Sequence, residues 1–174
     1  IRKEMGVLFQ GGALFDSMNV EENVMFPLNM FTDMSYEEKL ERVNFCLNRV
    51  NLSGINKLAT SELSGGMMKR VAIARAISNS PKYLFCDEPN SGLDPMTAEL
   101  IDDLIKEITE EYNITTVINT HDINSVIKIG QTINFIYKGK LWWRGDNKSV
   151  MKADNRELND FLFSTELTKR IKLV

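Results

Sequence analysis

Hydrophobic and polar positions follow two alternating patterns along the chain. Continuous apolar runs occupy residues 5–9, 83–86 and 114–118, and such runs are typical of strands buried in a parallel sheet. Between them, apolar residues recur every three or four positions, which predicts amphipathic helices. The alternation predicts an α/β fold, with a parallel sheet flanked by helices.

Local signals indicate where the first helices begin. Asn19 and Ser35 are each followed three residues later by a glutamate, which is the capping-box arrangement of a helix start. The second box precedes a helical repeat of apolar residues, which are Leu40, Val43, Leu47 and Val50. Residues 19–61 are therefore predicted to form an all-helical subdomain inserted into the α/β core.

The rest of the chain returns to the α/β pattern. Asp94 and Pro95 form a typical helix start, an N-cap followed by proline at the first helical position. Residues 133–137 and 140–143 flank Lys138-Gly139 and predict a hairpin. We expect a single domain over 1–174, with a core continuation at 62–150 and a helical extension at 151–174.

Composition narrows the class of protein. The formal net charge of −3 provides no global basic field for nucleic acid. No apolar run approaches the roughly 20 residues needed to span a bilayer. The two cysteines, Cys46 and Cys86, lack metal-type spacing and are predicted to be buried free thiols in a reducing compartment.

Two segments carry the strongest candidate chemistry. Ser64-Gly65-Gly66 opens a helix, where free N–H groups and the helix dipole favour an anion, although such a start can also be a simple cap. Asp87 and Glu88 end an apolar strand, and this placement is costly unless the charges are used. One carboxylate could hold Mg²⁺ and the next could orient water.

His121 and Gln10 carry less information by themselves. His121 is the single histidine of the chain and follows the strand at 114–118, where it could donate a hydrogen bond to a phosphate or be purely structural. Gln10 ends the first predicted strand. Ligands of open α/β sheets bind at such strand ends and in the loops that follow.

Taken together and in order, these segments resemble the ATP-binding-cassette (ABC) family across nearly the whole chain. The order is Gln10, a helical insertion, Leu63-Ser64-Gly65-Gly66-Met67, a strand with Asp87-Glu88, Ser91-Gly92-Leu93-Asp94, and then His121 after another strand. The resemblance implies a partial P-loop NTPase core that binds ATP and Mg²⁺.

The resemblance also implies a role for each matching residue. Gln10 corresponds to the Q-loop glutamine, a Mg²⁺ ligand, and Asp87 to the Walker B aspartate at the metal. Glu88 corresponds to the catalytic glutamate that polarises water, and His121 to the switch histidine. Leu63 to Met67 correspond to the signature motif, in which Ser64, Gly65 and Gly66 would bind the γ-phosphate of ATP held by the opposite subunit. Leu63 and Asp94 are expected to belong to the same nucleotide-binding set. The D-loop, which ends at Asp94, links the two sites.

By the same resemblance, the complete protein is an ATPase subunit of a membrane transporter. Its expected partners are a transmembrane permease and a second ATPase subunit in a head-to-tail homodimer, with no nucleic acid. Its expected location is the cytoplasmic side of the bacterial inner membrane, as a peripheral protein. Residues Gly11 to Val24 resemble the phospholipid-trafficking (Mla-type) subfamily, and by that resemblance this stretch would form part of a groove for a permease helix. The alternative is that Leu14, Phe15 and Met18 are ordinary core or interface residues shared by many importers.

The sequence departs from the family pattern in one important respect. No G-x-x-x-x-G-K-[ST] string occurs in it, so the lysine of the phosphate-binding loop has no counterpart. We therefore expect a fragment that lacks the N-terminal Walker A part and is inactive alone, rather than a protein that has lost nucleotide binding. Two other functions remain open: a soluble ABC protein acting on ribosomes or DNA, and a non-catalytic module that docks on a permease.

Overall fold

The structure is a computed structural model that describes residues 1–164, and it divides into two compact units between Thr120 and His121. The division falls inside the predicted core continuation at 62–150, and the single-domain organisation stays a prediction.

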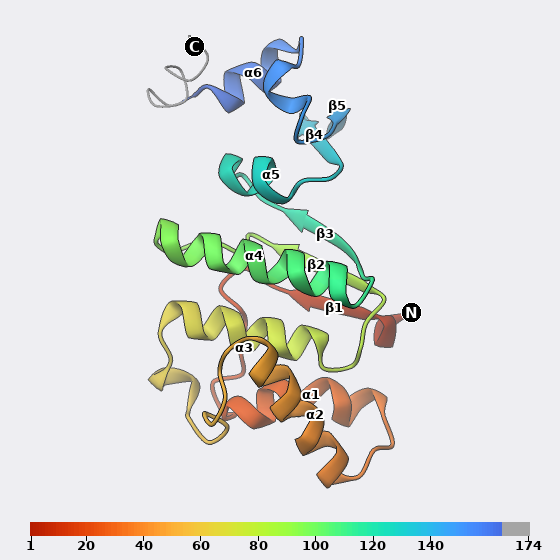
Figure 1. The fold of residues 1–174 in the computed structure, drawn as a ribbon, viewed down its shortest axis with the longest axis vertical. Coiled ribbons are helices and arrows are strands. Elements are labelled where there is room, and N and C mark those ends of the chain that lie inside the picture. Colours follow the sequence, from red (N-terminus) through yellow and green to blue (C-terminus); the bar gives the residue numbers. More distant parts are fainter. Residues whose placement is uncertain (165–174) are drawn as a thin grey trace. The chain divides into compact units, whose positions relative to one another are not determined.

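The first unit is built on a three-stranded parallel sheet. Its strands are β1 (Met5–Leu8), β2 (Tyr83–Asp87) and β3 (Thr115–Asn119), with β2 in the centre (Figure 1). The register places Leu8 opposite Cys86, and Cys86 opposite Ile118. The predicted parallel sheet is therefore confirmed, although β3 begins and ends one residue later than the predicted run.

Two helices cover one face of this sheet. They are α3 (Gly65–Ile77) and α4 (Pro95–Glu111), and their apolar residues join the sheet in one hydrophobic core. Leu84 and Cys86 point into that core and are buried. On the opposite face, Tyr83 and Val117 are 46% and 52% exposed. The prediction of a buried strand at 114–118 is thus wrong for this face, because α3 and α4 pack only on the other side.

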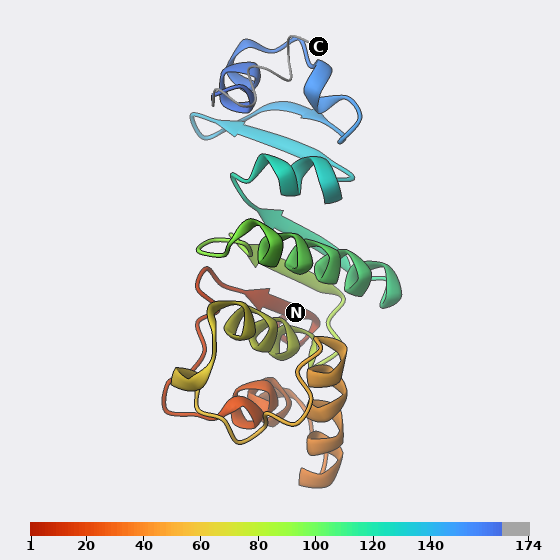
Figure 2. The ribbon, with the colours of Figure 1, turned by 60° about the vertical axis from the view of Figure 1, so that its left-hand side comes forward.

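The helical insertion consists mainly of α1 (Val20–Phe31) and α2 (Tyr36–Arg49), and a 3-10 helix at Thr60–Glu62 follows at its end. Another short 3-10 helix, Arg2–Glu4, precedes β1 outside the insertion. Asn19 and Ser35 both form the predicted capping boxes, with Glu22 and Glu38. α1 extends through Pro27, further than the short helix that its sequence predicts. In Figures 1 and 2, α3 lies between β1 and α1.

The second unit contains α5 (Ile123–Ile129), the antiparallel strands β4 (Ile133–Tyr137) and β5 (Lys140–Gly145), a 3-10 helix at Val150–Lys152, and α6 (Arg156–Leu162). The predicted hairpin is confirmed, whereas α5 has no counterpart in the prediction. A small separate core includes Val150, Leu158 and Leu162. The predicted extension at 151–174 contains α6, and its last ten residues lie outside the described part.

Cys46 and Cys86 are both free and buried, as predicted. Among residues 1–164, no helix combines the length and apolar character that a membrane crossing requires.

Candidate functional site

The parallel sheet brings several predicted site residues to one edge. β1 and β2 run in the same direction, so Gln10, two residues beyond β1, and Asp87, the last residue of β2, both lie at the carboxyl ends of strands. The Gln10 side-chain Nε2 donates a long hydrogen bond of 3.5 Å to the Ser91 hydroxyl, in the segment after Asp87-Glu88. The structure therefore places Gln10 beside the segment that carries the carboxylate pair.

The end of β3 organises that carboxylate pair. The Asn119 amide Nδ2 donates to Asp87 Oδ1 at 2.7 Å, and the Asn119 carbonyl accepts from the Glu88 N–H at 2.8 Å. Asn119 thus contacts both residues, a role that the sequence did not reveal. Its position as the last residue of the third parallel strand was the signal that could have identified it.

Glu88 has an unusual backbone conformation. Its φ angle is +46°, in the left-handed region that residues with a side chain rarely adopt. Its carbonyl accepts from the Ser91 N–H at 3.2 Å and from Lys69 Nζ at 3.2 Å. Strain of this kind persists only where the surroundings hold it, and it concentrates at functional sites.

Lys69 is a buried cation behind the carboxylates. Only 3% of it is exposed, and it lies on α3. Burial lowers the pKa of Lys69, while the negative charges of Glu88 and Asp87 act in the opposite direction. Sequence reasoning missed this residue, because no local signal indicates that the lysine faces inward rather than toward solvent.

The signature residues form the start of α3. The Ser64 hydroxyl accepts from the Met67 N–H at 3.3 Å and therefore caps the helix. A Cβ atom added to Gly66 would lie 2.9 Å from Thr97 Cγ2, whereas one added to Gly65 would lie 3.7 Å from Leu93 Cδ2. Gly66 is thus required for the close approach of α3 to the start of α4. The capping role is observed, and phosphate binding by Ser64, Gly65 and Gly66 stays a prediction.

Asp94 caps α4 in the same manner. Its Oδ1 accepts from the N–H groups of Met96 and Thr97 at 3.1 Å each, and its Oδ2 accepts from the Thr97 hydroxyl. The hydrogen bond from the Thr97 side chain lowers the pKa of Asp94. Asp94 is therefore the structural cap of α4, whose Thr97 side chain lies against Gly66, and its part in nucleotide binding stays a prediction. Leu63, just before the signature glycines, is buried.

The loop after Gln10 is held from α3 by Arg75. Three consecutive residues, Gly11, Gly12 and Ala13, have φ angles of +75°, +84° and +44°. Arg75 donates from Nη2 to the Gly12 carbonyl at 2.7 Å and from Nη1 to the Ala13 carbonyl at 2.8 Å. Burial lowers the pKa of Arg75, and its guanidinium also lies 5.7 Å from the centre of the Phe15 ring.

A mostly apolar groove of about 370 Å³ lies beside this loop. Its apolar lining comes from β1, the loop and α1, and includes Phe9, Phe15, Phe26, Pro27, Met30 and Phe31. Phe9 and Met30 are 53% and 60% exposed. Within the stretch predicted to form part of a groove, Phe15 lines it, Leu14 packs against the core, and Met18 is not among the lining residues.

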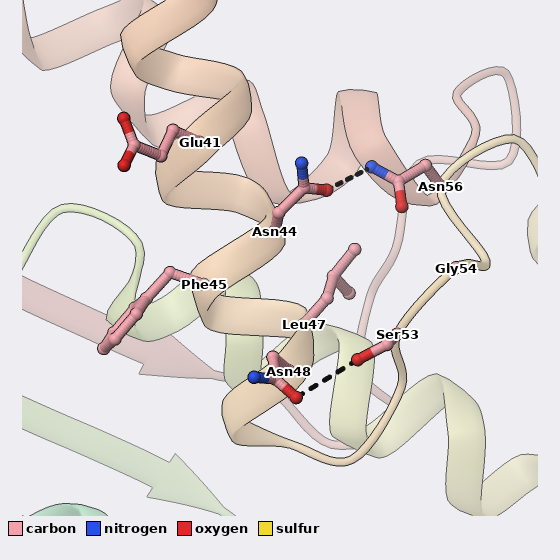
Figure 3. Close-up of a pocket in the computed structure, with 8 residues that line it drawn as sticks. All are labelled: Glu41, Asn44, Phe45, Leu47, Asn48, Ser53, Gly54 and Asn56. Carbon is pink, nitrogen blue, oxygen red and sulfur yellow. Dashed lines mark hydrogen bonds between the residues drawn. The ribbon is translucent and has the colours of Figure 1, made fainter.

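A second hollow of about 470 Å³ lies on the helical insertion, between α2 and the chain that follows it (Figure 3). Its polar side chains bond to each other: Asn56 donates to Asn44 at 2.8 Å, and Ser53 donates to Asn48 at 3.2 Å. These bonds tie α2 to the following loop. The hollow is therefore explained by local structure.

His121 is the first residue of the second unit, two positions beyond the end of β3. Its predicted role as a phosphate contact stays a prediction. Among residues 1–164, no group of three or more histidine, cysteine, aspartate or glutamate side chains is placed to hold a metal ion. One carboxylate from Asp87 and one amide oxygen from Gln10 suit Mg²⁺, which normally completes its shell with water and substrate phosphates.

The sheet, the helical insertion and the helix-capping signature define the nucleotide-binding domain of an ABC ATPase, with a P-loop NTPase fold. The chain belongs to this family: a family model described as "ABC transporter" matches residues 1–91.

Individual relatives transport different substrates. The chain is 36% identical over 162 residues to the intermembrane phospholipid transport system ATP-binding protein MlaF of Haemophilus influenzae, with 93% of this chain and 61% of that protein covered. It is 37% identical over 157 residues to the methionine import ATP-binding protein MetN of Bacillus subtilis, with 90% and 46% covered. The chain thus spans about half to three fifths of the length of these relatives.

Solved structures of ABC cassettes are also similar to this chain. A dimeric MJ0796 cassette bound to ADP and phosphate superposes with a TM-score of 0.74 at 35% identity, with 84% of this chain and 64% of that chain covered. The cbiO1 protein of Clostridium perfringens, part of the ABC transporter complex cbiONQ, gives 0.80 at 31% identity, with 99% and 67% covered.

Proposed function

We propose that the protein containing this chain hydrolyses ATP to ADP and phosphate and uses the energy to drive a membrane transporter. The observation that carries this proposal is the arrangement at the end of β2, where Asn119 and Lys69 fix Asp87 and Glu88 beside the Gln10 segment. Two adjacent carboxylates at a strand end suit a metal ligand and a water-orienting group.

Each residue then has a defined task. Asp87 and Gln10 would hold Mg²⁺, which supplies charge neutralisation for the phosphates when bound. Glu88 would orient the attacking water, and His121 would donate a hydrogen bond to the γ-phosphate. In a head-to-tail homodimer, Ser64, Gly65 and Gly66 of the other subunit would complete the phosphate site, with Leu63 and Asp94 supporting it.

We further propose that the partner is a transmembrane permease whose helix docks in the groove at Phe15. An amphipathic helix buries its apolar side in such a groove, and the exposed rings of Phe9 and Phe15 provide the matching surface. The protein would therefore act as a peripheral subunit at the cytoplasmic side of the bacterial inner membrane.

The proposed cargo is phospholipid. Two observations support this choice over other cargo: the similarity to MlaF and the apolar segment from Gly11 to Val24 that leads into α1. The similarity to MetN, a methionine importer, makes amino-acid import the competing assignment. Transfer of labelled phospholipid by the reconstituted ATPase–permease complex, compared with uptake of labelled methionine, separates the two. Methionine uptake without phospholipid transfer would refute the lipid assignment.

The hydrolytic role is tested by Glu88→Gln in the complete ATPase. We expect hydrolysis to fall at least a hundredfold, while ATP still promotes dimers that size-exclusion chromatography detects. Glu99→Gln is a matched control on the surface of α4 and should leave hydrolysis within about twofold. Retained hydrolysis in the Glu88→Gln protein would remove Glu88 from its proposed role.

A further inference from the structure

The buried Lys69 connects the signature helix to the backbone of Glu88. Lys69 lies on α3, the helix that Ser64 caps at its N-terminal end. The Lys69 ammonium donates to the Glu88 carbonyl at 3.2 Å, across 19 positions of sequence. A buried cation is costly unless it is paired or hydrogen-bonded, so a side chain only 3% exposed requires a reason to be there.

The geometry at Glu88 supplies that reason. With φ at +46°, Glu88 depends on external contacts to keep its conformation, and contacts reach both sides of its backbone. The Asn119 carbonyl oxygen accepts from the Glu88 N–H at 2.8 Å, while Lys69 Nζ donates to the Glu88 carbonyl. The Lys69 bond comes from a helix rather than from the sheet, so it fixes the Glu88 peptide relative to α3.

We propose that Lys69 is a positioning residue for Glu88, which holds the glutamate backbone in its left-handed conformation through the hydrogen bond to the Glu88 carbonyl. The proposal rests on the ATPase function argued above. Because the same helix begins at Ser64 and Gly65, Lys69 also links the signature residues of one nucleotide site to the glutamate of the other. A displacement of α3 would therefore be passed directly to Glu88.

The test compares two substitutions in the complete ATPase. Lys69→Met keeps most of the aliphatic length, in a side chain one atom shorter, but cannot donate a hydrogen bond. Lys69→Gln loses the charge but keeps an N–H donor, and its side chain, also one atom shorter, is small enough for the same space. Lys82→Met, at a lysine that pairs with Glu4 near the surface, serves as the matched control.

We expect Lys69→Met to lower kcat for ATP about tenfold or more while KM changes less than about twofold, because misplacement of a reacting group affects the chemical step rather than binding. Lys69→Gln should retain at least a third of kcat. In a Glu88→Gln background, Lys69→Met should cause no further fall in single-turnover hydrolysis, since Lys69 acts through Glu88.

Several results would overturn the proposal. These are wild-type kcat in the Lys69→Met protein, an equal loss in Lys69→Gln, or an additive loss on top of Glu88→Gln. If circular dichroism shows that the Lys69→Met protein does not fold, the Lys69→Gln protein is used for the test alone. A fall of more than about tenfold in the kcat of Lys69→Gln would then count against the proposal. An inactive wild-type protein would instead refute the ATPase function itself.

Discussion

Arg75 provides a direct test of how the loop after Gln10 is held. Only 7% of Arg75 is exposed, and its guanidinium donates to two consecutive loop carbonyls, those of Gly12 and Ala13. Replacement by methionine keeps the aliphatic bulk but removes both donors. The two carbonyls would lose their partner in the same loop that contains three positive φ angles in succession.

The size of the effect follows from these contacts. A hydrogen bond from a charged donor contributes about 1.5–3 kcal/mol, so the pair contributes about 3–6 kcal/mol. The cost of burying the guanidinium, which also lowers the pKa of Arg75, offsets part of this. We therefore expect Arg75→Met to reduce the free energy of unfolding by about 3 kcal/mol, the net of the two contributions. Arg75→Lys, which can reach one carbonyl, should lose about half as much.

The assay is thermal unfolding followed by circular dichroism. For a protein of about 150–250 residues, each kcal/mol corresponds to about 2–4 °C, so Arg75→Met should lower the midpoint by about 6–12 °C. The control is Arg156→Met, because the Arg156 side chain is 88% exposed and its ion pair with Asp160 is long at 3.9 Å. Its midpoint should stay within about 2 °C of the wild type. A shift of that small size in Arg75→Met would refute the reasoning.

Three further predictions concern stability and reactivity. Burial raises the pKa of Glu21, but hydrogen bonds from Lys57 and other donors outweigh it and hold the pKa below its usual 4.5. The ionised Glu21 therefore stabilises the folded protein fully above pH 4.5, and this contribution is lost as the pH falls through the folded pKa. In urea titrations below pH 4.5, Glu21→Gln should therefore lose less stability on acidification than the wild type. An unchanged acid dependence would contradict this. The buried Tyr112 hydroxyl has no hydrogen-bond partner within the described chain, so Tyr112→Phe should raise the free energy of unfolding by about 1 kcal/mol in the same titrations, and a loss would argue for an unseen partner. Burial raises the pKa of Cys46 to about 11 and that of Cys86 to about 12. Both thiols should react with iodoacetamide only after denaturation, as mass spectrometry can check; rapid native labelling would show that they are accessible.

Much of the fold could be predicted because its signals are local. The N-caps at Asn19, Ser35 and Asp94 depend on residues two or three positions away, and all three form as expected. The parallel sheet followed from apolar runs separated by helical segments. The strand ends then indicated where Gln10 and Asp87 would lie.

The rest depends on contacts between distant parts of the chain. The hydrogen bond from Asn119 to Asp87 exists only because β2 and β3 are adjacent, and their order cannot be read from either strand alone. The inward direction of Lys69 depends on the packing of α3 against the end of β2. The exposure of Val117 depends on which face the helices cover, which the apolar run at 114–118 does not specify.

The pairing of β1 with β2 has a consequence for how the chain folds. Met5 aligns with Tyr83, and the whole helical insertion and α3 lie between them in sequence. During synthesis, β1 therefore leaves the ribosome long before β2 exists, while the capped helices can already form. Sheet assembly is a late event governed by distant contacts, which slows folding. Until then, β1 presents an unpaired edge that other chains can join, so stalled synthesis before residue 83 would favour aggregation.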